Sequence, residues 1–283
     1  MECINPFMVN YQKDDETAVP CGKCIPCLKK RISHWSFRLM QEERTATSAH
    51  FVTLTYANLE KNAKQKLSTI SPNGFPSLCK RDLQLYFKRL RKLHPSGSRL
   101  KYYAVGEYGT KGFRPHYHII LFNADVNVIS KAWTRSGISI GHVHVGTVTV
   151  KSVGYTLAYI MQGKWRPRHK RDDRTPEFSC MSKGIGVGYV LDPKWVKWHY
   201  SDLDGRMYCS IEEGKKIGMP RYYKQKLYDD ETRKRIGEIS REKAIIATNA
   251  KKAKIGADKF YHERREFILD LHRRGDPRIN KKL

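Results

Sequence analysis

The amino-acid sequence predicts an α+β fold built on one antiparallel sheet. Between residues 51 and 150, the expected elements follow the order strand, helix, strand, strand, helix, strand. This order is typical of the split βαβ, ferredoxin-like arrangement, in which helices cover one face of the sheet and the other face stays open for a site. Helical patterns also occur before and after this region, so we expect added helices at both ends of the chain.

Each element of the sheet region is predicted by its hydrophobic period. A run rich in β-branched and aromatic residues predicts the first strand at 51–57. Apolar residues at helical spacing predict the next helix, with Ser77 as its cap. A second helical stripe covers Val126–Trp133, and an alternating run predicts a last strand that ends at Val150.

The flanking regions differ in composition from the sheet region. An irregular leader precedes a helix expected at 28–42, and the mostly charged chain after residue 229 predicts one or two surface helices. We therefore expect three parts, namely a cysteine-rich leader with an N-terminal helix at 1–47, a sheet domain at 48–200, and a basic, mainly helical region at 201–283.

The charge of the chain restricts its partners. The 283 residues include 54 Lys and Arg but 28 Asp and Glu, which gives a formal net charge of +26. Such an excess predicts a polyanionic partner, and nucleic acid is favoured over a membrane because the sequence has no apolar run of membrane-spanning length, signal peptide or lipidation motif. We therefore expect an intracellular protein without a membrane partner.

The hairpin expected at 102–122 carries the main candidate site. Side chains alternate in a strand, so His116 and His118 share one face, and folding the hairpin at 111–112 sets Glu107 opposite His116. Two imidazoles and a carboxylate can hold a divalent cation, Mn²⁺ or Mg²⁺, with positions left for a phosphate oxygen. Solvated histidines on a polar face are the alternative, because a His-x-His pair alone has low specificity.

A second His-x-His pair, His142 and His144, competes for the same role. It ranks lower because it has no carboxylate at hairpin distance, although its side chains could line the same face.

Two tyrosines form the other chemical candidate. Tyr155 and Tyr159 lie four residues apart in a predicted helix at 154–164, so both hydroxyls lie on one face. Such a pair is more often a packing stripe. Beside a metal site in a very basic protein, however, it fits a phosphodiester transesterase, whose tyrosine needs activation because its ordinary pKa is about 10.

The leader contains a group of cysteines at short spacing. Cys21, Cys24 and Cys27 are separated by two-residue gaps, and Cys3 is a candidate fourth ligand for a structural Zn²⁺. The alternative is a set of reduced, partly buried cysteines, since the usual zinc arrangement has two well-separated pairs. Four of the seven cysteines lie in these 27 residues, which argues against a secreted disulfide framework.

Aromatic residues alternate with cations at 192–200 and 219–228. This composition can stack bases and pair phosphates along a single strand, but ordinary packing explains any one aromatic equally well. The sequence shows no nucleotide-binding helicase motif, so we expect unwinding to be borrowed.

Several motifs resemble those of a known family. FVTLTY, GEYG with RPHYH, and the Tyr-xxx-Tyr helix resemble the three motifs of HUH endonucleases, which are named for two histidines that flank a hydrophobic residue. More closely, PCGKCIPC, GEYGTKGFRPHYHIILF, FSCMSKGIG and MPRYYKQKL are similar to the replication initiation proteins of gokushovirus-type microviruses, which are small single-stranded DNA phages. The similarity runs from about residue 20 to 227.

The resemblance implies an HUH nicking domain at 48–200. It implies His116, His118 and Glu107 as metal ligands, and Tyr155 and Tyr159 as the nucleophiles of a covalent 5′-phosphotyrosyl intermediate in rolling-circle replication. The implied partners are single-stranded or supercoiled phage origin DNA and the host helicase and DNA polymerase, in the host bacterial cytoplasm.

One position departs from the family pattern. Such proteins often carry a lysine three residues after each tyrosine, but Ala158 and Gln162 stand there, which leaves Lys164 as the nearest cation and the candidate helper. Two other classes of function were considered, a non-catalytic single-stranded nucleic-acid-binding protein and an iron oxygenase. The high charge and the tyrosine pair argue against the oxygenase.

Overall fold

The computed structural model describes most of the chain, namely residues 3–9, 17–57, 68–94, 97–109, 112–162, 170–211 and 214–275. The chain divides into two compact units. Unit 1 combines Met1–Phe37 with Val187–Leu283, and unit 2 is Arg38–Gly186. The helix α1 (Ile25–Glu43) contributes residues to both.

Unit 2 contains a five-stranded sheet in which every neighbouring pair is antiparallel. Its order is β10-β3-β7-β6-β11, with bounds β3 (Ala49–Tyr56), β6 (Lys101–Tyr108), β7 (Pro115–Phe122), β10 (Gly141–Thr147) and β11 (Phe178–Met181). The predicted antiparallel sheet in a mixed chain of helices and strands is confirmed. The edge strand β11 was not predicted.

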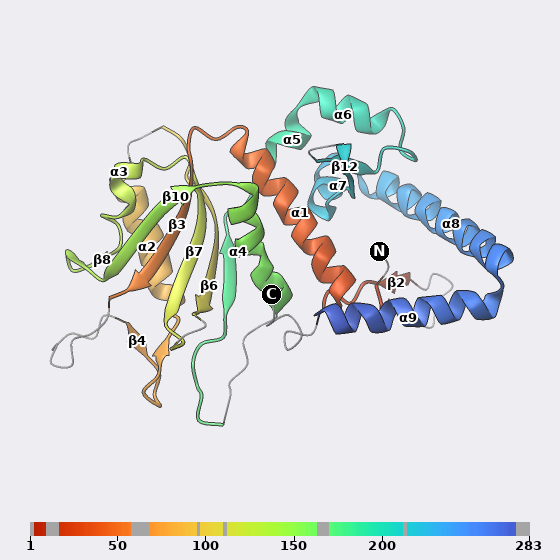
Figure 1. Cartoon of the computed structure of the whole chain (residues 1–283). Helices are drawn as coiled ribbons and strands as arrows, with labels where there is room; N and C mark the ends of the chain where they lie inside the picture. Colours follow the sequence, from red (N-terminus) through yellow and green to blue (C-terminus); the bar gives the residue numbers. More distant parts are fainter. Residues whose placement is uncertain are drawn as a thin grey trace. The chain divides into compact units, whose positions relative to one another are not determined.

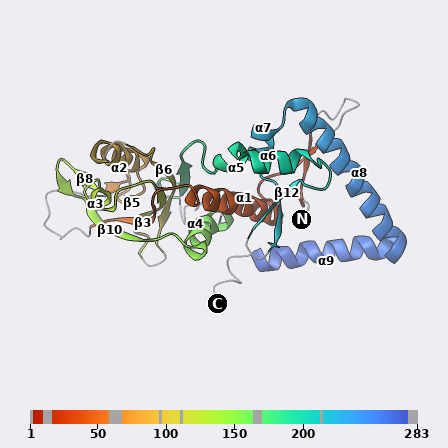
Figure 2. The same ribbon diagram turned by 90° about the horizontal axis from the view of Figure 1, so that it is seen from above.

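Helices lie on both faces of this sheet. Figures 1 and 2 show α2 (Lys80–Leu93) on one face and α4 (Val150–Gln162) on the other, where α4 contacts β6 and β7. The apolar core lies on the α2 face, and it includes Val52, Leu54, Leu83, Tyr86, Leu90, Tyr117, Ile119, Leu121 and Trp133. The face opposite α2 is therefore only partly open, because α4 covers part of it.

The alternating pattern of the strands determines which side chains enter the core. In β3, Val52 and Leu54 are buried, whereas Thr53 and Thr55 are half-buried on the other face. Burying such an apolar side chain contributes about 1.5–3 kcal/mol, and a shift of one residue would move all of them out of the core. The core therefore fixes the side chains on the opposite face.

Three sequence predictions in this region were wrong in detail. The helix α3 (Val126–Ile129) is a single turn, and Trp133 is buried in the turn that follows it. The helix α2 has Cys79 at its N-cap, and Ser77 instead lies in β5 (Pro76–Ser77), where its hydroxyl accepts a hydrogen bond from the backbone of Thr175.

The last predicted strand ends at Thr147 rather than at Val150. The hydroxyl of Thr149 accepts a hydrogen bond from the backbone N–H of Ser152, and the hydroxyl of Ser152 accepts one from Thr149. These reciprocal bonds form a helix cap, so α4 begins at Val150, earlier than the sequence predicted.

Short two-stranded pairs complete unit 2. They are formed by β4 (Thr69–Ile70) with β5 and by β8 (Thr134–Arg135) with β9 (Ile138–Ser139). The predicted turn at 111–112 lies partly outside the described residues.

Unit 1 joins the two ends of the chain around an aromatic cluster. Its remaining elements are β1 (Phe7–Val9), β2 (Thr17–Val19), α5 (Gly188–Leu191), α6 (Pro193–Tyr200), β12 (Tyr208–Ser210), β13 (Lys216–Gly218), α7 (Arg221–Leu227), α8 (Asp230–Ile255) and α9 (Ala257–Gly275). The rings of Tyr189 and Tyr223 stack at 5.1 Å, and Phe37 packs edge-on against both. The leader is not wholly irregular as predicted, because β1 and β2 pair. The two predicted C-terminal helices are confirmed, and no helix in the described ranges has the length and apolarity needed to span a bilayer.

Candidate functional site

The register of the sheet gathers polar residues on the face that α4 partly covers. His116 lies opposite Glu107 on β6 and opposite Thr55 on β3, while His118 lies opposite Thr53. Directly opposite residues in a sheet point to the same face. The predicted pairing of Glu107 with His116 is confirmed, and the two histidines, the glutamate and both threonines share one face.

His142 and His144 lie on the same face, as the sequence suggested. They pair with Thr55 and Thr53 from the outer strand β10, and both are exposed. Glu107 and the hairpin histidines lie farther into the sheet, so the two His-x-His pairs differ mainly in their access to a carboxylate.

The closest contact in the site joins Glu107 to His118. The Oε1 atom of Glu107 lies 2.7 Å from Nε2 of His118, and the two residues are 4% and 7% exposed. The other carboxylate oxygen, Oε2, is buried without a hydrogen-bond partner among the described residues. A buried carboxylate oxygen without a donor is costly, and a cation is one group that would satisfy it.

Threonine hydroxyls orient both imidazoles. The Oγ1 atom of Thr53 lies 3.1 Å from Nδ1 of His118, and that of Thr55 lies 3.0 Å from Nδ1 of His116. When Nδ1 carries the proton and donates it to the hydroxyl, Nε2 is the nitrogen that can bind a metal. Sequence reasoning missed these two threonines, although their alternation in FVTLTY places them on the site face.

The Nε2 atom of His116 lies close to the backbone of Gly109. A Cβ atom at position 109 would lie 3.0 Å from this nitrogen, which is closer than ordinary van der Waals contact. Burial lowers the pKa of His116, and the charge of Glu107 only partly opposes this effect. The imidazole is therefore neutral near pH 7, the state in which histidine binds metals.

Tyr155 approaches the site from α4. Its ring meets the ring of His118 edge-on at 5.2 Å, and Phe51 stacks on the other side of His118 at 5.7 Å. Tyr155 remains 48% exposed, so its hydroxyl is accessible to a ligand. Burial, followed by the negative charge of Glu107, raises the pKa of Tyr155.

Two predicted site residues are not placed by the structure. Tyr159 belongs to α4, one turn after Tyr155, but its side chain lies outside the described residues, and Lys164 lies outside them entirely.

The four leader cysteines converge. Their sulfur atoms all lie within 4.8 Å of one another, and in the part of the chain that the structure describes this is the one group of three or more His, Cys, Asp or Glu that is so close. It comprises Cys3, Cys21, Cys24 and Cys27. By the same distance, Glu107 and the two hairpin histidines do not form a closed cluster.

The aromatic residues at 192–200 and 219–228 serve mainly in packing. Tyr223 is fully buried, and Trp195 stacks on Tyr189 at 5.1 Å. Trp198 packs edge-on against Tyr208, while Tyr200 is 47% exposed. The packing alternative therefore describes most of these side chains.

Known proteins share much of this chain. A family profile for replication-associated proteins of the ORF2 type matches residues 49–164. A replication-associated protein ORF2 of Spiroplasma virus 4 is 30% identical over 237 residues, which cover 77% of this chain and 69% of that protein. The chain belongs to this family of replication-associated proteins.

Two further relatives of the same kind come from other phages. The replication-associated protein VP4 of Bdellovibrio phage phiMH2K is 26% identical over 79% of this chain and 76% of its own length. The replication-associated protein ORF4 of Chlamydia phage 1 is 25% identical over 74% of this chain and 53% of its own length. These relatives support a replication initiator of the gokushovirus type. No solved structure gives a significant match.

The matched segment of this replication-associated protein coincides with the site. Residues 49–164 begin with β3 and extend past the end of α4, so they include Glu107, both hairpin histidines and Tyr155. The cysteine cluster lies outside this segment.

Proposed function

We propose that this replication-associated protein is an HUH-type endonuclease that nicks and rejoins single-stranded DNA at the phage origin and thereby starts rolling-circle replication. The observation that carries the proposal is the contact series in which Tyr155 meets His118 and His118 meets Glu107. A nucleophile candidate thus lies beside a candidate metal face in a very basic chain. The strand order β10-β3-β7-β6 also supports a ferredoxin-like HUH core, because it is the order in which a split βαβ motif places its strands.

The donor set fits a divalent cation. His116, His118 and Glu107 would hold Mn²⁺ or Mg²⁺, and the buried Oε2 atom of Glu107 supplies an oxygen without a partner in the described chain. Closing the set requires the His116 side chain to approach the Glu107–His118 pair. When bound, such a cation polarises a phosphate oxygen and stabilises the charge that develops there.

Tyr155 is the first candidate nucleophile. Its Oη atom attacks the phosphorus of the scissile phosphodiester, the P–O3′ bond breaks, the phenolic proton leaves to solvent, and O3′ takes up a proton. The products are a 5′-phosphotyrosyl enzyme and a free 3′-hydroxyl for a host polymerase. Before the reaction, Glu107 keeps the proton on Tyr155, because its charge opposes the phenolate.

A second tyrosine is needed to close the circle. While the first tyrosine still holds the 5′ end, Tyr159 would cut the regenerated origin, since it lies one helical turn away in α4. Lys164 stays a candidate helper in this step. Strand separation would be supplied by a host helicase, because the sequence carries no helicase motif.

DNA binding is a separate property that the charge supports. A net charge of +26 provides many phosphate contacts, and these depend on salt rather than on the metal site. A non-catalytic single-stranded nucleic-acid-binding protein would share this property, but it would not need Tyr155 beside His118.

The test incubates the full chain with a labelled single-stranded origin oligonucleotide and Mn²⁺, then analyses it under denaturing conditions. We expect a covalent protein–DNA adduct that disappears with EDTA and in His118→Ala, whereas DNA binding by His118→Ala stays within about twofold of the parent because phosphate contacts dominate affinity. Binding without any adduct under these conditions would leave the non-catalytic protein as the correct interpretation.

A further inference from the structure

The cysteine cluster of unit 1 has no role in nicking, and it lies outside the segment that matches the family profile. We infer that Cys3, Cys21, Cys24 and Cys27 form a structural zinc site that fastens the start of the chain to the N-terminus of α1. Zinc in structural sites prefers four ligands in a tetrahedron, and four thiolates are one of its common sets. The cluster supplies four, all within 4.8 Å of one another.

The sulfur spacing matches a zinc tetrahedron. With zinc–sulfur bonds of about 2.3 Å, the sulfur atoms at two corners of a tetrahedron lie about 3.8 Å apart. The sulfurs of Cys24 and Cys3 lie 3.8 Å apart. A disulfide would bring two sulfurs to about 2.05 Å, so this spacing fits a shared metal rather than a crosslink.

Backbone N–H groups already point at the sulfurs. The N–H of Cys24 donates to the Cys21 sulfur at 3.3 Å, and that of Lys23 donates to the same atom at 3.4 Å. The N–H of Cys21 donates to the sulfur of Cys3 at 3.2 Å. Gly22 has a φ of +70°, a conformation that favours glycine and turns the chain around the Cys21 sulfur. Hydrogen bonds of this kind orient ligands and stabilise thiolate charge.

The local charge suits a zinc tetrathiolate. Binding of Zn²⁺ to four thiols releases four protons to solvent and leaves a site with two negative charges. Cys24 directly precedes α1, and Cys27 lies in its first turn, where the helix dipole favours negative charge. Lys23, Lys29 and Lys30 are exposed nearby in sequence, and the first turn of α1 has no acidic residue.

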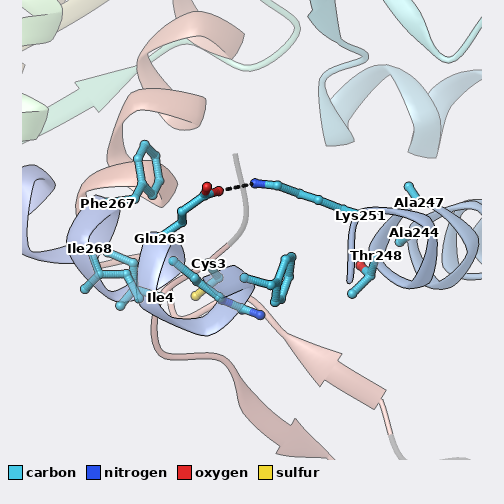
Figure 3. A pocket seen from close by; sticks show the side chains of 11 residues that line it. Cys3, Ile4, Ala244, Ala247, Thr248, Lys251, Glu263, Phe267 and Ile268 are labelled. Carbon is cyan, nitrogen blue, oxygen red and sulfur yellow. Dashed lines mark ion pairs between the residues drawn. The ribbon is translucent and has the colours of Figure 1, made fainter. Parts of the chain in front are cut away.

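The site would anchor a segment that reaches other parts of unit 1. Cys3 and Ile4 line a cavity of about 620 Å³ together with residues of α8 and α9, and Figure 3 shows Cys3 and Ile4 beside Phe267 and Ile268. In the same cavity, Lys251 of α8 forms an ion pair with Glu263 of α9 at 3.1 Å. Zinc would therefore hold one wall of this cavity to the start of α1.

The first experiment measures metal in the purified full chain after dialysis against EDTA at a concentration that strips Mn²⁺ from His and carboxylate sites. We expect about one zinc per chain by elemental analysis. Cys27→Ser should lower this value at least fivefold, whereas the matched control Cys79→Ser, a half-buried cysteine outside the cluster, should retain it. His118→Ala should also retain zinc, which separates this site from the nicking site.

A second measurement needs no variant. With zinc bound, a thiol reagent should modify about four fewer of the seven cysteines than in metal-free protein, and Co²⁺ substitution should give the strong visible absorption of a tetrahedral thiolate site. Metal-free protein with four reactive thiols, iron in place of zinc, or equal zinc loss in Cys27→Ser and Cys79→Ser would each overturn the zinc site. None of these results bears on adduct formation by Tyr155.

Discussion

Glu107 pairs with His116 in the strand register, but its carboxylate contacts His118, with 2.7 Å between Oε1 and Nε2. The glutamate side chain therefore reaches diagonally along the neighbouring strand, as long side chains in a sheet can. Its position between the two imidazoles means that one carboxylate can serve both.

Glu107→Gln should weaken metal use without removing it. An amide keeps the size of the side chain but loses the charge that attracts a cation, so the Mn²⁺ concentration for half-maximal nicking should rise about tenfold or more. The measurement is a Mn²⁺ titration of adduct formation, with the exposed Glu238→Gln as control. An unchanged titration would remove Glu107 from the ligand set.

Thr53→Val should reduce metal affinity through its effect on His118. Valine preserves the shape of threonine but removes the hydroxyl that lies 3.1 Å from Nδ1. Loss of such an orienting partner typically costs about 10–100-fold in metal affinity or activity. The same titration measures the effect, and Thr147→Val, exposed on the outer strand β10, is the control. Equal behaviour of the two variants would show that the hydroxyl does not orient the ring.

Gly109→Ala should hinder the site by a different route. The added Cβ would lie 3.0 Å from Nε2 of His116, so the ring would have to move away from its present position. We expect a higher Mn²⁺ requirement with little change in thermal stability, because Gly109 does not have a positive φ. Gly218→Ala, whose Cβ would meet no atom within 4 Å, is the matched control. If both variants nick like the parent, His116 does not bind the metal through Nε2.

The two tyrosines should have separable roles. Phenylalanine removes only the hydroxyl, so Tyr155→Phe with Tyr159→Phe should bind origin DNA but form no adduct. Each single variant should keep some single nicking and lose coupled cleavage and rejoining, measured as release of closed circles. Full circle release by either single variant would contradict the alternating mechanism.

Tyr117→Phe should destabilise the fold without touching the metal face. Its buried hydroxyl accepts a hydrogen bond from the backbone N–H of Cys79 at 2.8 Å, and it lies 3.0 Å from the hydroxyl of Tyr56. Leaving a buried N–H unpaired costs about 1–3 kcal/mol, which urea denaturation can measure. In Tyr86→Phe, the lost hydroxyl is buried without a hydrogen-bond partner in the described chain, so that variant should be neutral or more stable. A similar cost in both variants would contradict this reasoning.

The sequence predicted the hairpin well because a period of two leaves little freedom. Once Tyr117 and Ile119 enter the core, His116 and His118 must lie on the other face, and a short turn then fixes the partner of His116. The direction of the Glu107 side chain was not predictable in this way, since pairing determines the face but not which of two nearby rings a carboxylate contacts.

Long-range associations were also beyond the pattern. The strand β11 is four residues long and pairs with β6, about 70 residues away, so neither period nor turn residues indicated it. The four-residue α3 was overestimated because Trp133 continues the apolar stripe of a helix although it enters the core from a turn. Spacing suggested four cysteine ligands, but only the structure brings Cys3 to the other three.

The interrupted sequence of unit 1 sets an order of events during synthesis. Its first segment, Met1–Phe37, leaves the ribosome before all of unit 2, while Tyr189 and Tyr223, the aromatic partners of Phe37, follow roughly 150 residues or more later. At about 5–20 residues per second, Phe37 therefore waits about 8–30 seconds before the first of these rings exists. The four cysteines are complete at the start of this interval, so metal capture can precede every aromatic contact that Phe37 makes in unit 1. Nascent chains of this protein would then acquire zinc while they are still attached to the ribosome.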